Sequence, residues 1–336
     1  MSERQITIAI DAMGGEGSPF KTLKGAEFFS KKHPNILLKI FGNEESILET
    51  INKNKITLKN YSLIDCDENV SDNDNANTIL RYRKHSSIYK GLSFVKNNNN
   101  SGFVSAGNTA ALMILSRFVL GMIEGVDRPA ICSIIPNKKS YSLMMDLGAN
   151  VHVNADNLMQ FALMGYAYFL TIDPKRKPKI GLINIGTENN KGLEFLQDAK
   201  EMISNSFLKK DFLGFIEPNK ITNGICDIIL CDGYTGNIIL KTAEGLSDFI
   251  TNNLKNMFIK STKNKLAYKI LENDLKLFKN QIDPDEYNGA TLLGINGISV
   301  KSHGSANPYA FYCAINKCYE FIINNLNQKI IENFKT

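Results

Sequence analysis

The chain has 336 residues, of which 43% are hydrophobic and 22% are charged, and its formal net charge is +5 at pH 7. This is the composition of an ordinary globular protein, in a chain long enough to bury a large core. No apolar run approaches the roughly 20 residues that a membrane-spanning helix needs. Residues 1–5 are polar and lead directly into an apolar strand, without the basic and apolar segments of a secretion signal, so we predict a cytoplasmic protein.

The cysteines and histidines give no sign of a metal centre. The six cysteines form no C-x-x-C pair, and the chain has only four histidines. Cys132 and Cys231 lie inside apolar runs, where reduced thiols pack as small hydrophobic groups. The mildly basic charge fits acidic partners of several kinds and selects none of them. We predict no metal, no cofactor and no nucleic-acid partner.

Short apolar strands alternate with helical patterns along most of the chain. The predicted strands are residues 6–10, 36–41, 102–104, 130–135, 143–146, 180–185 and 228–231. Several are near-continuous apolar runs, which are typical of a parallel sheet covered on both faces. The helical patterns between them include residues 78–96, 109–120, 157–170 and 191–205. This alternation predicts an α/β fold with a doubly wound, mostly parallel sheet.

The segment from about residue 236 to residue 279 breaks this alternation, because two helical patterns follow one another with no strand between them. A last strand at residues 298–301 and a last helix at residues 308–327 close the chain. We therefore predict one α/β domain over residues 1–336, with a protruding helical pair inserted at about residues 238–280.

A small polar loop follows six of the predicted strands. In open α/β sheets, ligands bind beyond the carboxyl ends of the strands. Glycine in such a loop lets the backbone approach a ligand or adopt a positive φ angle. One loop of this kind is an ordinary turn, but six of them favour a binding site. The loops are residues 11–17, 105–109, 146–150, 186–192, 232–237 and 301–305.

The loop at residues 105–109 gives the clearest physical signal. It joins a strand to the first turn of a helix, where free backbone N–H groups and the helix dipole attract anions. The hydroxyls of Ser105 and Thr109 add donors. Asn108 or Thr109 can also act as an ordinary N-cap, and the two roles are compatible, but we favour an anion site. No loop matches G-x-G-x-x-G or G-x-x-x-x-G-K-[ST], so dinucleotide and P-loop functions lose their main support.

Three further side chains in these loops have both a chemical and a structural interpretation. Asp232 is a base or positioning group, or simply the acceptor of an Asx turn. Lys191, which the pattern places in the first turn of a helix, is a site cation or an ordinary surface lysine. His303 lies in a polar loop rather than on an apolar helix face, which favours a role at the site.

The loops resemble those of the PlsX family of bacterial phosphate acyltransferases, in the right order and over nearly the whole chain. Two departures from the family pattern are Asn288, where the first glycine of Gly-Gly-Ala is usual, and Phe215, where asparagine is expected. The resemblance is carried by DAMGG at 11–15, SAGNT at 105–109, DLGAN at 146–150, NIG at 184–186, KG at 191–192, DGYTGN at 232–237 and KSHG at 301–304.

The resemblance implies transfer of a fatty acyl group from acyl carrier protein to inorganic phosphate, which makes an acyl phosphate for glycerophospholipid synthesis. It also implies a homodimer, a downstream glycerol-3-phosphate acyltransferase, and a fold shared with phosphotransacetylases and isopropylmalate-type dehydrogenases. Phosphate is itself the nucleophile, so the reaction needs no covalent intermediate.

We assign positive charge or proton supply to Lys191 and His303, an oxyanion contact to Asn237 and positioning to Asp232. Phosphate or substrate binding is assigned to Asp11, Gly14, Gly15, Ser105, Gly107, Asn108, Thr109, Asp146, Asn150, Asn184, Gly186, Gly236, Lys241, Ser302 and Gly304.

Three other functions stay open. An NAD-dependent decarboxylating dehydrogenase on a similar fold needs an arginine-rich substrate site, and arginine is sparse here. A phosphotransacetylase that uses coenzyme A and short acyl groups is the second. A non-enzymatic scaffold for lipid enzymes at the membrane surface is the third.

Residues 260–279 form a basic amphipathic pattern. Five apolar residues, from Ala267 to Phe278, fall on one helical face, and six lysines against two acids give a local charge of +4. Such a helix lies on an anionic bilayer or packs on the protein body or on a partner subunit. We favour the inner face of the membrane, because a lipid-like product gains from release there. The lysines are Lys260, Lys263, Lys265, Lys269, Lys276 and Lys279, and the apolar residues are Ala267, Ile270, Leu271, Leu275 and Phe278.

Overall fold

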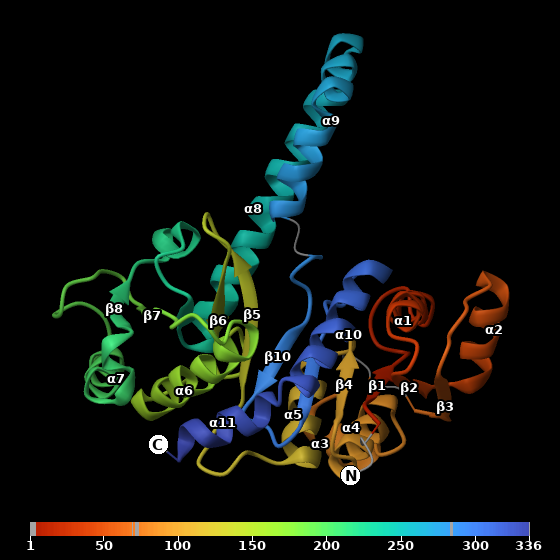
Figure 1. The fold of residues 1–336 in the computed structure, drawn as a ribbon, viewed down its shortest axis with the longest axis horizontal. Helices are drawn as coiled ribbons and strands as arrows, with labels where there is room; N and C mark the ends of the chain where they lie inside the picture. Colours follow the sequence, from red (N-terminus) through yellow and green to blue (C-terminus); the bar gives the residue numbers. More distant parts are fainter. Residues whose placement is uncertain (1–4, 69, 71–73, 283–284, 336) are drawn as a thin grey trace.

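The computed structural model describes residues 5–68, 70, 74–282 and 285–335 (Figure 1). Over these residues an 11-stranded sheet has the order β3-β2-β1-β4-β11-β10-β5-β6-β9-β7-β8. The strands are β1 (Thr7–Asp11), β2 (Leu37–Gly42), β3 (Tyr61–Asp65), β4 (Ser101–Ser105), β5 (Ala130–Pro136), β6 (Tyr141–Met145), β7 (Ile180–Ile183), β8 (Phe212–Ile216), β9 (Ile228–Leu230), β10 (Ala290–Leu293) and β11 (Ile298–Lys301). The helices are α1 (Phe20–Lys32), α2 (Glu44–Asn54), α3 (Ala76–Tyr82), α4 (Ser87–Asn97), α5 (Thr109–Leu120), α6 (Ala155–Ile172), α7 (Glu194–Asn205), α8 (Gly233–Ile259), α9 (Thr262–Ile282), α10 (Pro308–Ile323) and α11 (Leu326–Phe334).

The sheet consists of two parallel blocks that run in opposite directions. Seven of the ten strand pairings are parallel, which confirms the doubly wound, mostly parallel fold predicted from the sequence. The strands β3, β2, β1, β4 and β11 share one direction. The pairings β11–β10, β10–β5 and β5–β6 are antiparallel, so β6, β9, β7 and β8 share the opposite direction.

Two hydrophobic clusters cover the two faces of the sheet. Alternate residues of β1 divide between them, with Ile8 and Ile10 in one cluster and Ala9 in the other, as the pleat of a strand requires. Helices α1, α6 and α10 contribute to the first cluster, where Phe29 is fully buried. Helices α4 and α5 contribute to the second, where Leu115 is fully buried. Helices on both faces define the doubly wound arrangement.

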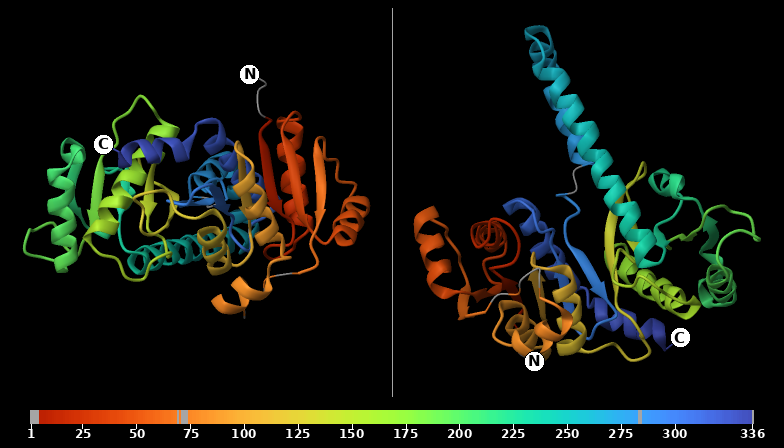
Figure 2. Two further views of the ribbon diagram at one scale, coloured as in Figure 1. Left: turned by 90° about the horizontal axis from the view of Figure 1, so that it is seen from below. Right: turned by 180° about the vertical axis from the view of Figure 1, so that it is seen from behind.

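Helices α8 and α9 form a long antiparallel pair that projects from the body of the molecule (Figures 1 and 2). They occupy the segment where the sequence pattern predicts two consecutive helices, and we call residues 233–282 the helical pair. The rings of Phe258 and Tyr268 join the two helices, with centroids 5.6 Å apart. The buried residues of α8 are Gly233 and Gly236, both in its first turn, so the rest of that helix is partly or fully exposed. Among the described residues, no helix combines the length and apolar character needed to cross a bilayer.

Three predicted helices have different bounds in the structure. The predicted helix 78–96 is divided into α3 and α4 by a turn at Arg83 and Ser86. The predicted helix 191–205 begins only at Glu194, so Lys191 precedes it. The predicted helix 308–327 is divided at Asn325, whose φ of 52° is left-handed. The assignment of a single domain to residues 1–336 stays a prediction.

The sequence pattern also does not predict β3, β8 or β10. Strands β3 and β8 are the two edges of the sheet, and their side chains are partly exposed, so neither shows a continuous apolar run. Phe215 of β8 is buried in the core, which explains an apolar residue at this departure from the family pattern. Strand β10 contains Thr291 and lies between Gly289 and Gly294, so it shows no continuous apolar run.

Candidate active site

The loops that follow β1, β4 and β11 lie side by side at one end of the sheet, because these strands are parallel neighbours. Their backbones touch. A Cβ atom on Gly14 would lie 2.4 Å from the Gly107 nitrogen, and one on Gly15 would lie 2.7 Å from the Gly304 oxygen. Glycine at these positions is therefore required by close packing, and three of the predicted loops meet. This first loop group consists of residues 11–17, 105–109 and 301–305.

Asp11, the buried last residue of β1, connects the first loop group to α4. Its carboxylate accepts hydrogen bonds from the Ser105 hydroxyl at 2.6 Å, the Ser87 hydroxyl at 2.7 Å and the Met13 N–H at 3.0 Å. A serine hydroxyl has one proton, so Ser105 commits its proton to Asp11, and its oxygen accepts from the Gly107 N–H. Ser105 is thus a positioning residue rather than an added donor for an anion. Burial raises the pKa of Asp11, and these hydrogen bonds oppose the rise.

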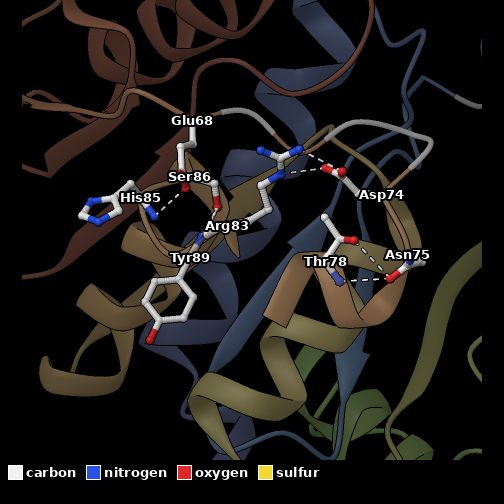
Figure 3. A network of polar contacts seen from close by, with 8 residues as sticks. All are labelled: Glu68, Asp74, Asn75, Thr78, Arg83, His85, Ser86 and Tyr89. Atoms are coloured by element: carbon white, nitrogen blue, oxygen red, sulfur yellow. Dashed lines mark hydrogen bonds and ion pairs between the residues drawn. The ribbon is translucent and has the colours of Figure 1, made fainter. Parts of the chain in front are cut away.

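A surface network fixes the helix that carries Ser87 (Figure 3). Arg83 binds both carboxylate oxygens of Asp74, at 2.8 and 2.9 Å. Ser86 caps α4, because its hydroxyl accepts a hydrogen bond from the Tyr89 N–H. Together these contacts hold the turn between α3 and α4, so they also place the Ser87 hydroxyl that reaches the end of β1.

Two buried lysines, which the sequence pattern does not mark as site residues, lie in this group. Lys21, in the first turn of α1, is 4% exposed, and its Nζ donates to the carbonyl of Gly304. Lys301, the last residue of β11, is 9% exposed, and its Nζ donates to the carbonyl of Ser302 at 2.5 Å. Burial lowers the pKa of Lys21, and nearby carboxylates oppose the fall. Two buried cations therefore lie at the first loop group, one supplied by α1 and one by the end of β11.

Asn288 holds the loop that follows β11. Its Nδ2 donates to the Ser302 hydroxyl at 2.8 Å and to the Ala310 carbonyl at 2.7 Å, while its Oδ1 accepts from the His303 N–H at 3.0 Å. The His303 side chain is exposed, and its Nδ1 lies 2.9 Å from the Ser305 hydroxyl. The backbone of His303 is thus fixed while its imidazole stays open to solvent.

The start of α5 confirms the capping role predicted from the sequence, and its role as an anion site stays a prediction. Asn108 is the N-cap, and its Oδ1 accepts from the Ala111 N–H at 2.9 Å. Thr109 is the exposed first residue of the helix. The positive end of the α5 dipole therefore lies in the first loop group, beside the two buried lysines.

The loops after β6, β7 and β9 belong to the other block of strands. Asp146 is fully buried there, and its carboxylate accepts hydrogen bonds from the Ile131 and Ala149 N–H groups and from the backbone and side chain of Asn150, at 2.7–3.0 Å. Burial raises the pKa of Asp146, and these bonds oppose the rise. Asp146 and Asn150 therefore shape their loop from within. This second loop group consists of residues 146–150, 184–192 and 232–237.

Two glycines let the first turn of α8 pack on that loop. A Cβ atom on Gly236 would lie 1.9 Å from the Asp146 carbonyl oxygen, and one on Gly233 would lie 2.6 Å from the Asn150 carbonyl oxygen. Any larger side chain at either position would displace the start of the helix. The prediction of Gly236 as a site residue thus falls on a position where packing also demands glycine.

The first turns of α8 place Asp232, Asn237 and Lys241. Asp232 is the N-cap of the helix, and its carboxylate accepts from the Thr235 N–H at 2.8 Å and the Thr235 hydroxyl at 2.6 Å. Asn237 is half-buried, and a Cβ atom on Gly148 would lie 3.6 Å from its side chain. Lys241 is exposed one turn later, on the same face of the helix as Asn237.

The loop after β7 contains Asn184, Gly186 and Lys191. Asn184 is buried, and its Nδ2 donates to the Lys191 carbonyl at 2.9 Å. The Lys191 side chain is exposed, and its Nζ lies 2.7 Å from a carboxylate oxygen of Glu188. That contact raises the pKa of Lys191. A Cβ atom on Gly186 would lie 2.7 Å from the Lys191 side chain, so the glycine makes room for it.

The base of the helical pair connects the two loop groups. Helix α8 begins in the second group, and α9 returns beside it, with the Asn264 side chain donating to the Met257 carbonyl. Antiparallel pairing from that contact places Ile282, at the end of α9, level with Ile239 near the start of α8. Six residues then lead to Asn288, which contacts Ser302 and His303 of the first group, a path of at most about 20 Å. The second loop group therefore lies at the base of the helical pair, and Asn288, which holds the first group, lies within about 20 Å of that base.

Solved structures that share this fold include phosphotransacetylases. The phosphotransacetylase from Streptococcus pyogenes matches with a TM-score of 0.63 and 16% identity, over 95% of this chain and 94% of that chain. The EutD phosphotransacetylase from Staphylococcus aureus matches with a TM-score of 0.61 and 13% identity, over 95% and 94%. The protein thus has the phosphotransacetylase-like α/β fold.

Residues 6–329 match the model of the family described as fatty acid synthesis protein. The phosphate acyltransferase of Paraburkholderia xenovorans is 39% identical over 326 residues, which cover 97% of this chain and 88% of the relative. That of Clostridium tetani is 38% identical over 328 residues, covering 96% and 98%. The chain belongs to this family of phosphate acyltransferases, which confirms the resemblance found in the strand-end loops.

Proposed function

We propose that the protein transfers a fatty acyl group from acyl carrier protein to inorganic phosphate, forming acyl phosphate for glycerophospholipid synthesis. The observation that carries this proposal is the family match over residues 6–329, with relatives named phosphate acyltransferase. The cations and the α5 dipole in the first loop group support an anionic substrate. Family membership favours this function over a dehydrogenase, a coenzyme A-dependent phosphotransacetylase or a scaffold.

The proposed reaction is a direct displacement on a thioester. A phosphate oxygen attacks the carbonyl carbon and forms a C–O bond, and the negative charge moves to the carbonyl oxygen. The C–S bond then breaks, and the carrier thiol leaves as a thiolate that takes up a proton. The protein has to hold the phosphate dianion, stabilise the oxyanion and supply charge or a proton near the sulfur.

We assign the phosphate to the first loop group and the acyl thioester to the space near the base of the helical pair. The exposed imidazole of His303 and the ammonium of Lys191 supply positive charge or a proton. Asn237 donates to the oxyanion, and Lys241 on the same face of α8 contacts the substrate. Asp232 positions these groups as the cap of α8.

The helical pair supports the proposed partners: a second subunit and an anionic membrane surface. On α9, Ile270 is 76% exposed, Leu271 42% and Phe278 43%, so three residues of the apolar face predicted from the sequence are exposed in one chain. The other two, Ala267 and Leu275, are half-buried. Lys276 and Lys279 belong to the predicted basic surface, but their side chains lie outside the described residues. We propose a cytoplasmic homodimer that associates peripherally with the inner face of the membrane and delivers acyl phosphate to a glycerol-3-phosphate acyltransferase.

The test is to incubate the protein with fatty acyl carrier protein and radiolabelled phosphate. Label is expected in an acid-labile acyl phosphate, without divalent metal or nicotinamide. Lys191→Ala and His303→Ala are each expected to lower turnover about 100- to 1,000-fold while the melting temperature stays near that of wild type. Acyl carrier protein that stays acylated would contradict the proposed function, and near-normal turnover in both variants would contradict the assigned roles.

A further inference from the structure

We propose that Lys21 binds a phosphate group in the first loop group, as a cation supplied by α1 to the ends of β1, β4 and β11. The identity of the ligand rests on the proposed function. The binding role of Lys21 rests on where α1 places its ammonium group.

The ammonium group of Lys21 lies where the three loops meet. Its Nζ donates to the Gly304 carbonyl in the loop after β11. A Cβ atom on Gly15, in the loop after β1, would lie 2.7 Å from this Nζ and 2.8 Å from the carbonyl oxygen of Ala106, in the loop after β4. The Thr22 hydroxyl fixes the same turn of α1 by donating to the Ala12 carbonyl at 2.8 Å. Lys21 is therefore held at the junction rather than extended into solvent.

The buried charges around this junction favour an anionic ligand. Among the described residues at these three strand ends, the buried charged side chains are Asp11, Lys21 and Lys301, two cations and one carboxylate. The carboxylate of Glu16 also acts on Lys21, but it is exposed to solvent. Asp11 already accepts three hydrogen bonds from other groups. An ammonium group has three donors and is costly to remove from water unless an opposite charge compensates it. A phosphate dianion provides that charge.

The depressed pKa of Lys21 fits this role. Burial lowers the pKa of its ammonium group in the ligand-free protein. A bound dianion stabilises the charged form and reverses that shift. Two sources supply the same chemistry: free inorganic phosphate, and the phosphate ester on the phosphopantetheine arm of an acyl carrier.

The experiment measures binding without turnover. Isothermal titration of the full chain with inorganic phosphate, and separately with phosphopantetheine, compares wild type with Lys21→Met. Methionine retains the length of the buried stem and removes the charge. Lys53→Met is the matched control, because Lys53 is exposed on α2 and the change in net charge is the same. We expect the Kd for a phosphate group to rise at least tenfold in Lys21→Met and to stay within twofold of wild type in Lys53→Met.

The two titrations identify the source, since the ligand whose affinity falls is the one that Lys21 contacts. Equal affinity of wild type and Lys21→Met for both ligands, or no binding of either to wild type, overturns the proposal. If Lys21→Met does not fold, reductive methylation of wild type gives the answer. Phosphate is expected to slow modification of Lys21 but not of Lys53, and unchanged rates overturn the proposal. If only the proposed function is wrong, phosphate still binds to the protein but no acyl phosphate forms.

Discussion

Lys317 is a cation whose ionisation is coupled to the folding of the protein. It lies in α10, half-buried, and its Nζ donates to the carbonyls of Tyr287 at 3.0 Å and Gly289 at 2.8 Å. Burial lowers its pKa from 10.5 to about 8. The two carbonyls belong to the segment that leaves the helical pair, so Lys317 holds this segment on α10.

The lowered pKa of Lys317 predicts how stability depends on pH. Between pH 8 and 10.5 the folded protein has released this proton while the unfolded chain still binds it, so stability rises with pH and is lost as pH falls through about 8. Relative to Lys317→Met, the free energy of unfolding of wild type is expected to gain about 2 kcal/mol across this window, less than the full shift because the side chain is partly exposed. Urea unfolding measures it, with Lys53→Met as control. A constant difference between wild type and Lys317→Met would contradict the prediction.

Some residues of the candidate site can be predicted from the sequence, and others cannot. Asp11 and Ser302 stand directly after apolar strands, so the pattern places them correctly at strand ends. Lys21 becomes a site residue only through Gly304, 283 positions away, and no local pattern contains that contact. The hydroxyl of Ser105 appears free in the sequence, but Asp11, 94 positions away, takes its proton.

Asn288, in the segment between α9 and β10, holds the loop that follows β11. Asn288→Ala removes the hydrogen bonds to the Ser302 hydroxyl and the His303 N–H. We expect kcat to fall about tenfold, because a loop that moves by a fraction of an ångström misplaces the imidazole. Asn288→Asp retains the acceptor for the His303 N–H and is expected to lose less. The assay with labelled phosphate measures both variants.

Asn327→Ala is the matched control for Asn288. The Asn327 side chain donates to the Ile295 carbonyl at 3.0 Å, away from the first loop group. Both alanine variants are expected to lose about 1 kcal/mol of stability or somewhat more, but only Asn288→Ala is expected to lose turnover. Equal turnover of Asn288→Ala and Asn327→Ala would show that Asn288 has only a structural role.

The bounds of a helix or strand are predictable where its hydrophobic periodicity ends at a turn signal in the sequence, and not elsewhere. No glycine or proline lies between Ile79 in α3 and Ile88 in α4, so the sequence shows no break there and the two helices are predicted as one. The ion pair between Arg83 and Asp74 and the cap on α4 separate them, and these contacts depend on the folded loop before α3.

The directions of the strands in the sheet determine which strand-end loops meet. The sequence locates the ends of β1, β4, β6, β7, β9 and β11, but not which of these ends share an edge of the sheet. Three antiparallel pairings between β11 and β6 divide the loops into two groups. One of the two strands between β11 and β6 is β10, which shows no continuous apolar run in the sequence. Topology of this kind is set by packing over the full chain.

The helical pair carries exposed apolar side chains among the described residues of one chain, at Ile270, Leu271 and Phe278. The full protein is expected to bind vesicles that contain anionic lipid, and added salt is expected to weaken binding by screening the lysines. Leu271→Glu combined with Phe278→Glu removes two apolar anchors worth about 1.5–3 kcal/mol each when fully buried, so vesicle binding is expected to fall at least a hundredfold. Turnover in solution is expected to persist, because neither Leu271 nor Phe278 belongs to either loop group.

A matched double variant separates charge from position. Leu48→Glu combined with Leu213→Glu makes the same change in charge at exposed leucines on α2 and β8, and vesicle binding is expected to change far less. Vesicle sedimentation measures binding, and analytical ultracentrifugation of the same samples measures the oligomeric state. If Leu271→Glu with Phe278→Glu yields monomers or unfolded protein, the apolar face is a subunit interface rather than a membrane contact. Retained dimers that no longer sediment with vesicles, yet still form acyl phosphate, assign the face to the bilayer.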